Sequence, residues 1–183
     1  VKYLKLEIKE NKVSRVQVDM GEPILAPDQI PVRAEHEPVV RAPITVCGKE
    51  WEMTCVSMGN PHAVIFIDTP VREFPLEEVG PSFECHERFP RRTNTEFIRV
   101  LASDRMEMRV WERGAGETYA CGTGACGAVV AAVLNGLCGR KVTVELLGGE
   151  LEIEWRESDG HVYMTGEAAA VFDGEIALPE GLE

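Results

Sequence analysis

The chain has 183 residues, enough for one ordinary domain with a hydrophobic core. Its 31 acidic and 19 basic residues give a formal charge of −12, which argues against nucleic acid or an anionic membrane as partner, because both attract basic patches. Hydrophobic residues make up 44%, too many for global disorder, and no apolar run reaches the about 18 residues of a transmembrane helix.

The first residues have the pattern of strands. Residues 2–8 alternate in polarity as in the middle of a sheet, and residues 12–20 repeat that alternation. The chain starts without Met, and no basic head followed by an apolar run marks a signal peptide. We therefore expect the chain to begin partway through a longer protein. Four prolines in residues 21–38 then predict an irregular crossing segment.

The middle and end of the chain predict short strands separated by turns. Residues 62–67 are continuously apolar, which indicates a strand buried on both faces. Gly48-Lys49 and Gly148-Gly149 fit hairpin turns. We expect a short helix over 76–87 and further strands over 39–47, 51–57, 95–101, 106–111, 142–147, 150–155, 161–165 and 168–176.

Residues 122–137 predict one long helix without a single charged side chain. A helix at the surface carries a polar face, so one that is apolar all round is buried all round. Strands precede and follow it in the sequence. The simplest packing is an α+β fold in which a curled, mostly antiparallel sheet wraps around this central helix.

Cys121 stands directly before that helix, at the end of a glycine-rich loop. Free amides and the helix dipole favour anions at this position, so we expect a lowered pKa for the Cys121 thiol. The amides of Gly122, Thr123 and Gly124 are positioned to hold a ligand carboxylate. The alternative is a core thiol beside glycines that serve only a tight turn.

The other cysteines show no motif. No C-x-x-C pair occurs, and neither the cysteines nor the histidines have metal-ligand spacing, so we expect no metal site. Without a secretory signal we expect reduced thiols in a cytosolic protein. Five cysteines are therefore interpreted as structural: Cys47, Cys55, Cys85, Cys126 and Cys138.

Three further clusters of polar residues stand at strand ends. Asn60 and His62 flank a proline before the buried strand, and they suit an amino-acid ligand and a proton exchange with a thiol. Asn94 precedes the next strand, and Glu112-Arg113 closes the one after it; the Arg113 guanidinium suits a carboxylate. The alternatives are turn asparagines, a buried hydrogen-bonded histidine and a surface ion pair.

Taken together, these segments resemble the diaminopimelate epimerase family. The resemblance rests on Gly-Asn-Pro-His at 59–62, Arg-Thr-Asn at 92–94, and Glu-Arg-Gly-Ala-Gly-Glu-Thr at 112–118 followed by Ala-Cys-Gly-Thr-Gly-Ala at 120–125. It implies a reaction without a cofactor, in which two cysteines on opposite faces of diaminopimelate invert its α-carbon on the route to lysine and peptidoglycan. It gives catalytic roles to Cys121, His62 and Glu112, and substrate contacts to Asn60, Asn94, Glu112, Arg113, Gly122 and Thr123.

The resemblance also implies a missing part. The family has two pseudo-symmetric halves, and the second cysteine motif of the first half does not occur here. Residues 1–20 would be the last strands of the missing N-terminal half, 21–165 the C-terminal epimerase domain, and 166–183 a strand returning to the missing half. We expect this chain alone to be inactive. Phe172 stands where some members carry a dimer-contact tyrosine, which leaves a homodimer as an open possibility.

Two other functions compete with this interpretation. A proline or hydroxyproline racemase would share the Cys-Gly-Thr-Gly core, but an imino acid has no distal charged end for Asn94 and Glu112-Arg113. A non-catalytic amino-acid-binding domain would bind the ligand without exchanging its α-proton.

Overall fold

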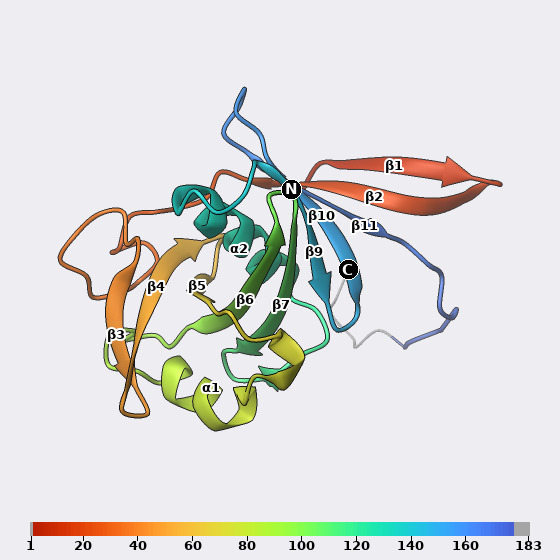
Figure 1. Ribbon diagram of the computed structural model, residues 1–183. Helices are drawn as coiled ribbons and strands as arrows, with labels where there is room; N and C mark the ends of the chain where they lie inside the picture. Colours follow the sequence, from red (N-terminus) through yellow and green to blue (C-terminus); the bar gives the residue numbers. More distant parts are fainter. Residues whose placement is uncertain (1, 178–183) are drawn as a thin grey trace.

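The computed structural model describes residues 2–177, which form a mixed sheet and two α-helices (Figure 1). The sheet order is β1-β2-β11-β10-β9-β7-β6-β5-β4-β3, and the short β8 pairs with β7. Every pairing is antiparallel except β5–β6 and β7–β9. This confirms the predicted α+β class. The strands are β1 Leu4–Lys9, β2 Lys12–Gly21, β3 Ala42–Val46, β4 Lys49–Ser57, β5 Pro61–Phe66, β6 Asn94–Ala102, β7 Arg105–Glu112, β8 Gly116–Glu117, β9 Lys141–Leu146, β10 Gly149–Trp155 and β11 Val162–Glu167.

The helix α2, Gly122–Leu134, is the centre of the main core. It contacts β4, β5 and β6 on one side and β9, β10 and β11 on the other, so the sheet curves around it as predicted (Figure 1). The helix ends three residues earlier than predicted. Asn135 returns a side-chain hydrogen bond to the Ala131 carbonyl, and Gly136 adopts φ +68°, the left-handed conformation that terminates helices.

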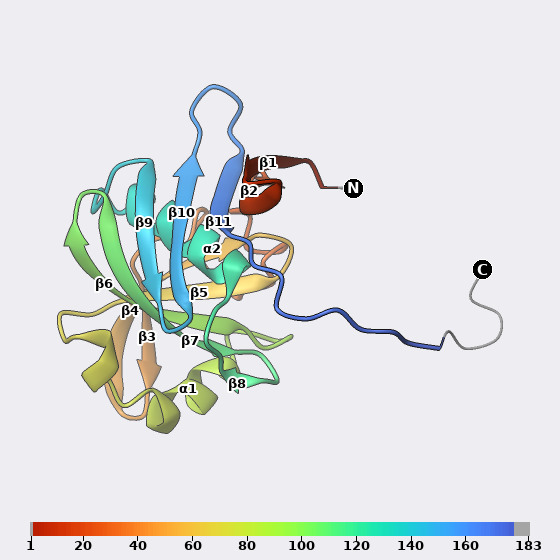
Figure 2. The ribbon, with the colours of Figure 1, turned by 90° about the vertical axis from the view of Figure 1, so that its right-hand side faces the viewer.

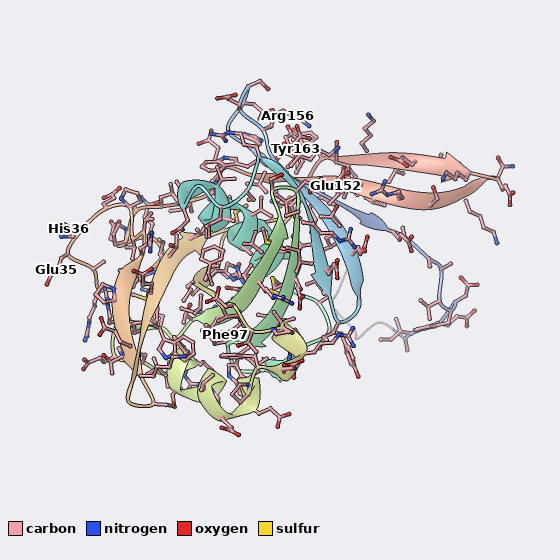
Figure 3. All side chains as sticks on the ribbon, in the orientation of Figure 1. Glu35, His36, Phe97, Glu152, Arg156 and Tyr163 are labelled. Atoms are coloured by element: carbon pink, nitrogen blue, oxygen red, sulfur yellow. The ribbon has the colours of Figure 1, made fainter. Side chains whose placement is uncertain are left out.

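The opposite face of the sheet holds a second core under α1, Leu76–Glu84, and the short 3₁₀ turn η1, Val71–Glu73. Phe97 lies at its centre, in edge contact with Trp51 and Phe83 (Figure 3). Strand β5 is therefore buried on both faces, as the apolar run 62–67 predicts, and so are the adjoining parts of β4 and β6. Successive side chains of these strands alternate between the two cores.

The two ends of the chain differ most from the rest. The β1–β2 hairpin projects from the body, and every residue of β1 is exposed (Figure 1). Residues 168–177 form no strand and lead away from the sheet (Figure 2), where the sequence pattern predicts a strand. Both edges of β11 are already paired, with β10 and β2, so no free edge lies beside this segment. The remainder of the predicted returning strand, 178–183, lies outside the described residues.

Two smaller features complete the fold. The β3–β4 hairpin turns one residue earlier than predicted, at Cys47-Gly48, because both residues adopt the positive φ that a tight hairpin turn requires. The β9–β10 hairpin also turns one residue earlier than predicted, at Leu147-Gly148. Among residues 2–177, no helix has the length and apolar character needed to cross a membrane.

Candidate active site

Strand register brings the polar clusters together at one edge of the sheet. β5 and β6 run parallel with His62 opposite Asn94, and β6 pairs with the antiparallel β7 with Thr95 opposite Trp111. The first residues of β5 and β6 therefore meet the last residues of β7. Side chains of alternate residues share a face, so Asn94 and Glu112 point to the α2 side of the sheet together with His62.

Asn94 joins two of these strand ends. Its side-chain amide donates to the Pro61 carbonyl at 3.1 Å, and its Oδ1 accepts from the Arg113 amide at 2.8 Å. The side chain is almost fully buried, with 4% exposure. Asn94 thus holds the 60–62 turn against the 112–116 turn, and its contacts in this structure are to the protein itself.

His62 is fully buried between two polar partners. Its Nε2 lies 3.0 Å from Asn60 Oδ1, and its Nδ1 lies 2.6 Å from Glu96 Oε1. Gly59 makes the preceding tight turn possible with φ +101°, which places Asn60 between the buried ring and solvent. Sequence reasoning missed Glu96. The sequence predicted a strand over 95–101 but gave no indication that its charged residue Glu96 is buried.

Cys121 lies at the N-terminus of α2, as predicted. It is the N-cap residue, its carbonyl accepts the first helical hydrogen bond, and the thiol is buried. Its Sγ lies 3.6 Å from Thr123 Oγ1. Gly122 packs against Met164, whose sulfur would lie 2.8 Å from any Cβ at this position. A larger residue at 122 would therefore require the Met164 side chain to move.

The pKa of Cys121 moves opposite to the prediction. Burial raises it from 9.0 to about 12, and the Glu96 carboxylate adds to the rise. Hydrogen bonds from the Thr123 hydroxyl and the Gly124 amide lower it by less, and the charge of Glu112 raises it again. The expectation of a lowered pKa took account of the helix terminus, but not of burial or of these two carboxylates. Cys121 is therefore a thiol at neutral pH.

Glu112 and Arg113 lie side by side at the end of β7. The Glu112 carboxylate accepts a hydrogen bond from the Thr118 hydroxyl across the glycine loop. Arg113 is exposed, and its guanidinium donates to the Arg91 carbonyl at 3.1 Å. The alternative interpretation, a Glu112–Arg113 surface ion pair, is not among the ion pairs of residues 2–177. The exposed guanidinium is therefore a candidate carboxylate-binding group.

Glu84 holds the turn after β7, next to Glu112 and Arg113, by hydrogen bonds. Sequence reasoning did not identify it either. Its carboxylate accepts from Trp111 Nε1 at 2.8 Å, from the Gly114 amide at 2.9 Å and from Arg92 at 3.2 Å. Burial of the carboxyl acts to raise its pKa, but the hydrogen bonds outweigh burial and hold the pKa below 4.5. No sequence signal marked a residue in the last turn of α1 for this role.

The surface next to Cys121 is open. A depression of about 600 Å³ is lined by Ala120, Leu146, Gly148 and Leu151 among others, and its lining does not include Cys121. Within the described part of the chain, no three acidic, histidine or cysteine side chains converge as a metal site would require. The six cysteines carry no disulfide.

Comparison with known sequences identifies relatives of the whole chain. It is 57% identical over 178 residues to a diaminopimelate epimerase of Methanococcus maripaludis and 55% identical over 180 residues to one of Acetivibrio thermocellus. These alignments cover 97% and 98% of this chain and 64% of each relative. The chain thus spans about two thirds of the length of the curated relatives it matches.

Solved structures of low identity share the fold. A hydroxyproline epimerase of Agrobacterium vitis superposes with a TM-score of 0.63 at 12% identity, over 91% of this chain and 53% of that one. A phenazine biosynthesis protein of Bacillus anthracis superposes with a TM-score of 0.59 at 12% identity, over 89% and 60%. The family model described as diaminopimelate epimerase matches residues 54–171, which include all eight predicted site residues. The chain belongs to the diaminopimelate epimerase family.

Proposed function

We propose that the protein containing this chain interconverts L,L- and meso-diaminopimelate without a cofactor, on the route to lysine and peptidoglycan in the cytoplasm. The observation that carries the proposal is the buried Cys121 thiol at the N-terminus of α2, beside the strand ends that hold Asn60, Glu112 and Arg113. The family relationship supports the substrate, because its relatives are named for it.

Removing the α-proton of an amino acid places negative charge on its carboxylate. The amides at the start of α2 offer hydrogen bonds to that charge, which is worth most in a dry site. The exposed Arg113 guanidinium supplies a forked donor for a second carboxylate, such as the distal one of diaminopimelate. An imino acid has no such distal group, which favours diaminopimelate over proline.

Inversion needs a base on one face of the α-carbon and an acid on the other. With its raised pKa, Cys121 is protonated and acts as the acid in one direction: it gives its proton to the α-carbon and becomes a thiolate. The proton leaving the opposite face goes to a second thiolate. The chain contains no second Cys-Gly-x-Gly motif, so we propose that residues outside this chain supply that group and that the chain alone is nearly inactive.

The test is the exchange of the α-proton of L,L- and meso-diaminopimelate with D₂O, followed by NMR. We expect exchange when the first part of a family member is added to the chain and none in Cys121→Ala. Cys126→Ala, which removes a buried thiol further along the same helix, is the matched control and should retain exchange. Full turnover by the chain alone would contradict the two-part site. Binding without exchange in every mixture would favour an amino-acid-binding domain.

A further inference from the structure

Glu96 is a buried charged residue that the proposed reaction does not use. It lies in β6 on the α2 face, between Asn94 and Ile98, with 0% exposure. Its Oε1 contacts His62, and its Oε2 is buried without a hydrogen-bond partner among the described residues. Burying a carboxylate is costly, and an apolar pair of similar volume is often as stable. Stability alone therefore gives no reason for Glu96 at this place.

Glu96 and His62 are joined by a short hydrogen bond. The distance from Nδ1 to Oε1 is 2.6 Å, and both side chains are fully buried. The parallel register places His62 opposite Asn94 and Val64 opposite Glu96, so the two side chains meet diagonally on one face of the sheet. Gly127 of α2 lies next to the His62 ring. A Cβ on Gly127 would be 3.5 Å from Cγ of His62, an ordinary contact distance.

We propose that Glu96 is a positioning residue that fixes the ring of His62 for proton exchange at Nε2. A carboxylate oxygen accepts hydrogen bonds, so Nδ1 donates to Glu96 Oε1. Nε2 lies 3.0 Å from Asn60 Oδ1, an amide oxygen that also only accepts, so Nε2 donates there, and its proton is the one that His62 can exchange at the open end of the site. A carboxylate behind an imidazole selects the tautomer and the orientation in the same way in serine hydrolases. The catalytic meaning of the inference rests on the proposed epimerase function.

Glu96 also lies against the start of α2. A Cβ at Gly124 would sit 2.7 Å from Glu96 Oε1 and 3.1 Å from Cys121 Sγ, so both groups approach the same glycine. Only the absence of a side chain at 124 leaves room for them. One carboxylate thus contacts the ring of His62 and neighbours the Cys121 thiol, which couples the two proton-carrying groups of the site.

The first test reads the ring directly, in the chain itself. In ¹⁵N-labelled protein, NMR should show His62 protonated at Nδ1, with that proton far downfield as in short N–H···O⁻ bonds. Glu96→Gln removes the charge at equal volume, so the proton should move upfield or leave Nδ1. The matched control is Glu107→Gln, a half-buried carboxylate of β7 that pairs with Arg99, and it should leave the His62 signals unchanged. A His62 proton on Nε2 alone, or signals unaffected by Glu96→Gln, would overturn the proposal.

The second test measures α-proton exchange with the first part of the enzyme supplied. Glu96→Gln should lower kcat by about 10–100-fold, as the loss of a supporting carboxylate does elsewhere, with KM nearly unchanged. Glu96→Asp keeps the charge and should recover part of the loss. Wild-type kcat in a folded Glu96→Gln protein would refute the inference. If the NMR result holds and the wild-type mixture shows no exchange, the epimerase function fails while the positioning of His62 stands.

Discussion

Replacing Glu84 by alanine should loosen the turn that carries Glu112 and Arg113. The change removes the acceptor of the Trp111 indole and of the Gly114 amide. Hydrogen bonds to a charged group contribute about 1.5–3 kcal/mol each, and water replaces part of the bond at the exposed Gly114, so we expect a net loss of about 3 kcal/mol in the free energy of unfolding. For a chain of this size, that lowers Tm by about 6–12 °C.

Urea unfolding monitored by tryptophan fluorescence measures this loss, and Glu84→Gln is the matched control. Glutamine keeps one acceptor oxygen and loses the charge, so it should cost about 1 kcal/mol.

The pH dependence of this stabilisation has a defined sign. The pKa of Glu84 lies below 4.5 in the folded chain, so its contribution is present above that pH and is lost as pH falls through the folded pKa. The difference in unfolding free energy between wild type and Glu84→Gln should therefore decrease as the pH falls below 4.5.

The reasoning on Glu84 would be refuted by an alanine variant within the about 0.5 kcal/mol typical of surface substitutions. It would also be refuted by a difference between wild type and Glu84→Gln that does not change below pH 4.5. Either result would mean that the network does not stabilise the turn.

Three shorter predictions concern packing and the thiol. With a pKa of about 12, only about one Cys121 thiol in 10⁵ is ionised at pH 7, so iodoacetamide labelling read by mass spectrometry should be slow and should rise steadily to pH 10; a plateau near neutral pH would contradict the raised pKa. Gly80→Ala places a Cβ 2.5 Å from the Trp111 ring and should cost about 1–3 kcal/mol in thermal unfolding; an unchanged Tm would contradict that contact. Gly124→Ala should cost a similar amount and abolish exchange; a fully active variant would show that the helix start tolerates a side chain.

Local pattern was enough to predict the central helix and its place in the sheet. A run without charge from Gly122 onward requires burial on every side, and the structure has that burial. The end of the helix was wrong by three residues because the apolar pattern continues to Leu137. Asn135 and Gly136 end the helix, and a pattern of hydrophobic residues alone does not predict such a helix C-terminus.

The sequence predicted which polar residues lie at neighbouring strand ends, but not the electrostatic environment around Cys121. The motifs located Cys121 at the helix terminus, but its pKa is raised first by burial in the folded core and then by Glu96, a residue 25 positions earlier in the chain that the fold brings near. Residues 168–177 form no strand here, although their pattern predicts one. Alternation describes a single segment, whereas a strand also needs a partner, and the resemblance places that partner in the missing half.

The most direct test of the two-thiol reaction is to convert a small fraction of L,L-diaminopimelate in D₂O, with the complete site assembled. The measurement is the deuterium content of the α-carbons in the product and in the recovered substrate. If Cys121 delivers a proton to the face opposite the base, the meso product carries deuterium at its inverted α-carbon while the recovered L,L substrate stays protiated. This is the result we predict, and Cys121→Ala should form no deuterated product. Equal deuterium in product and recovered substrate would mean that one base serves both faces, and it would contradict the role given to Cys121.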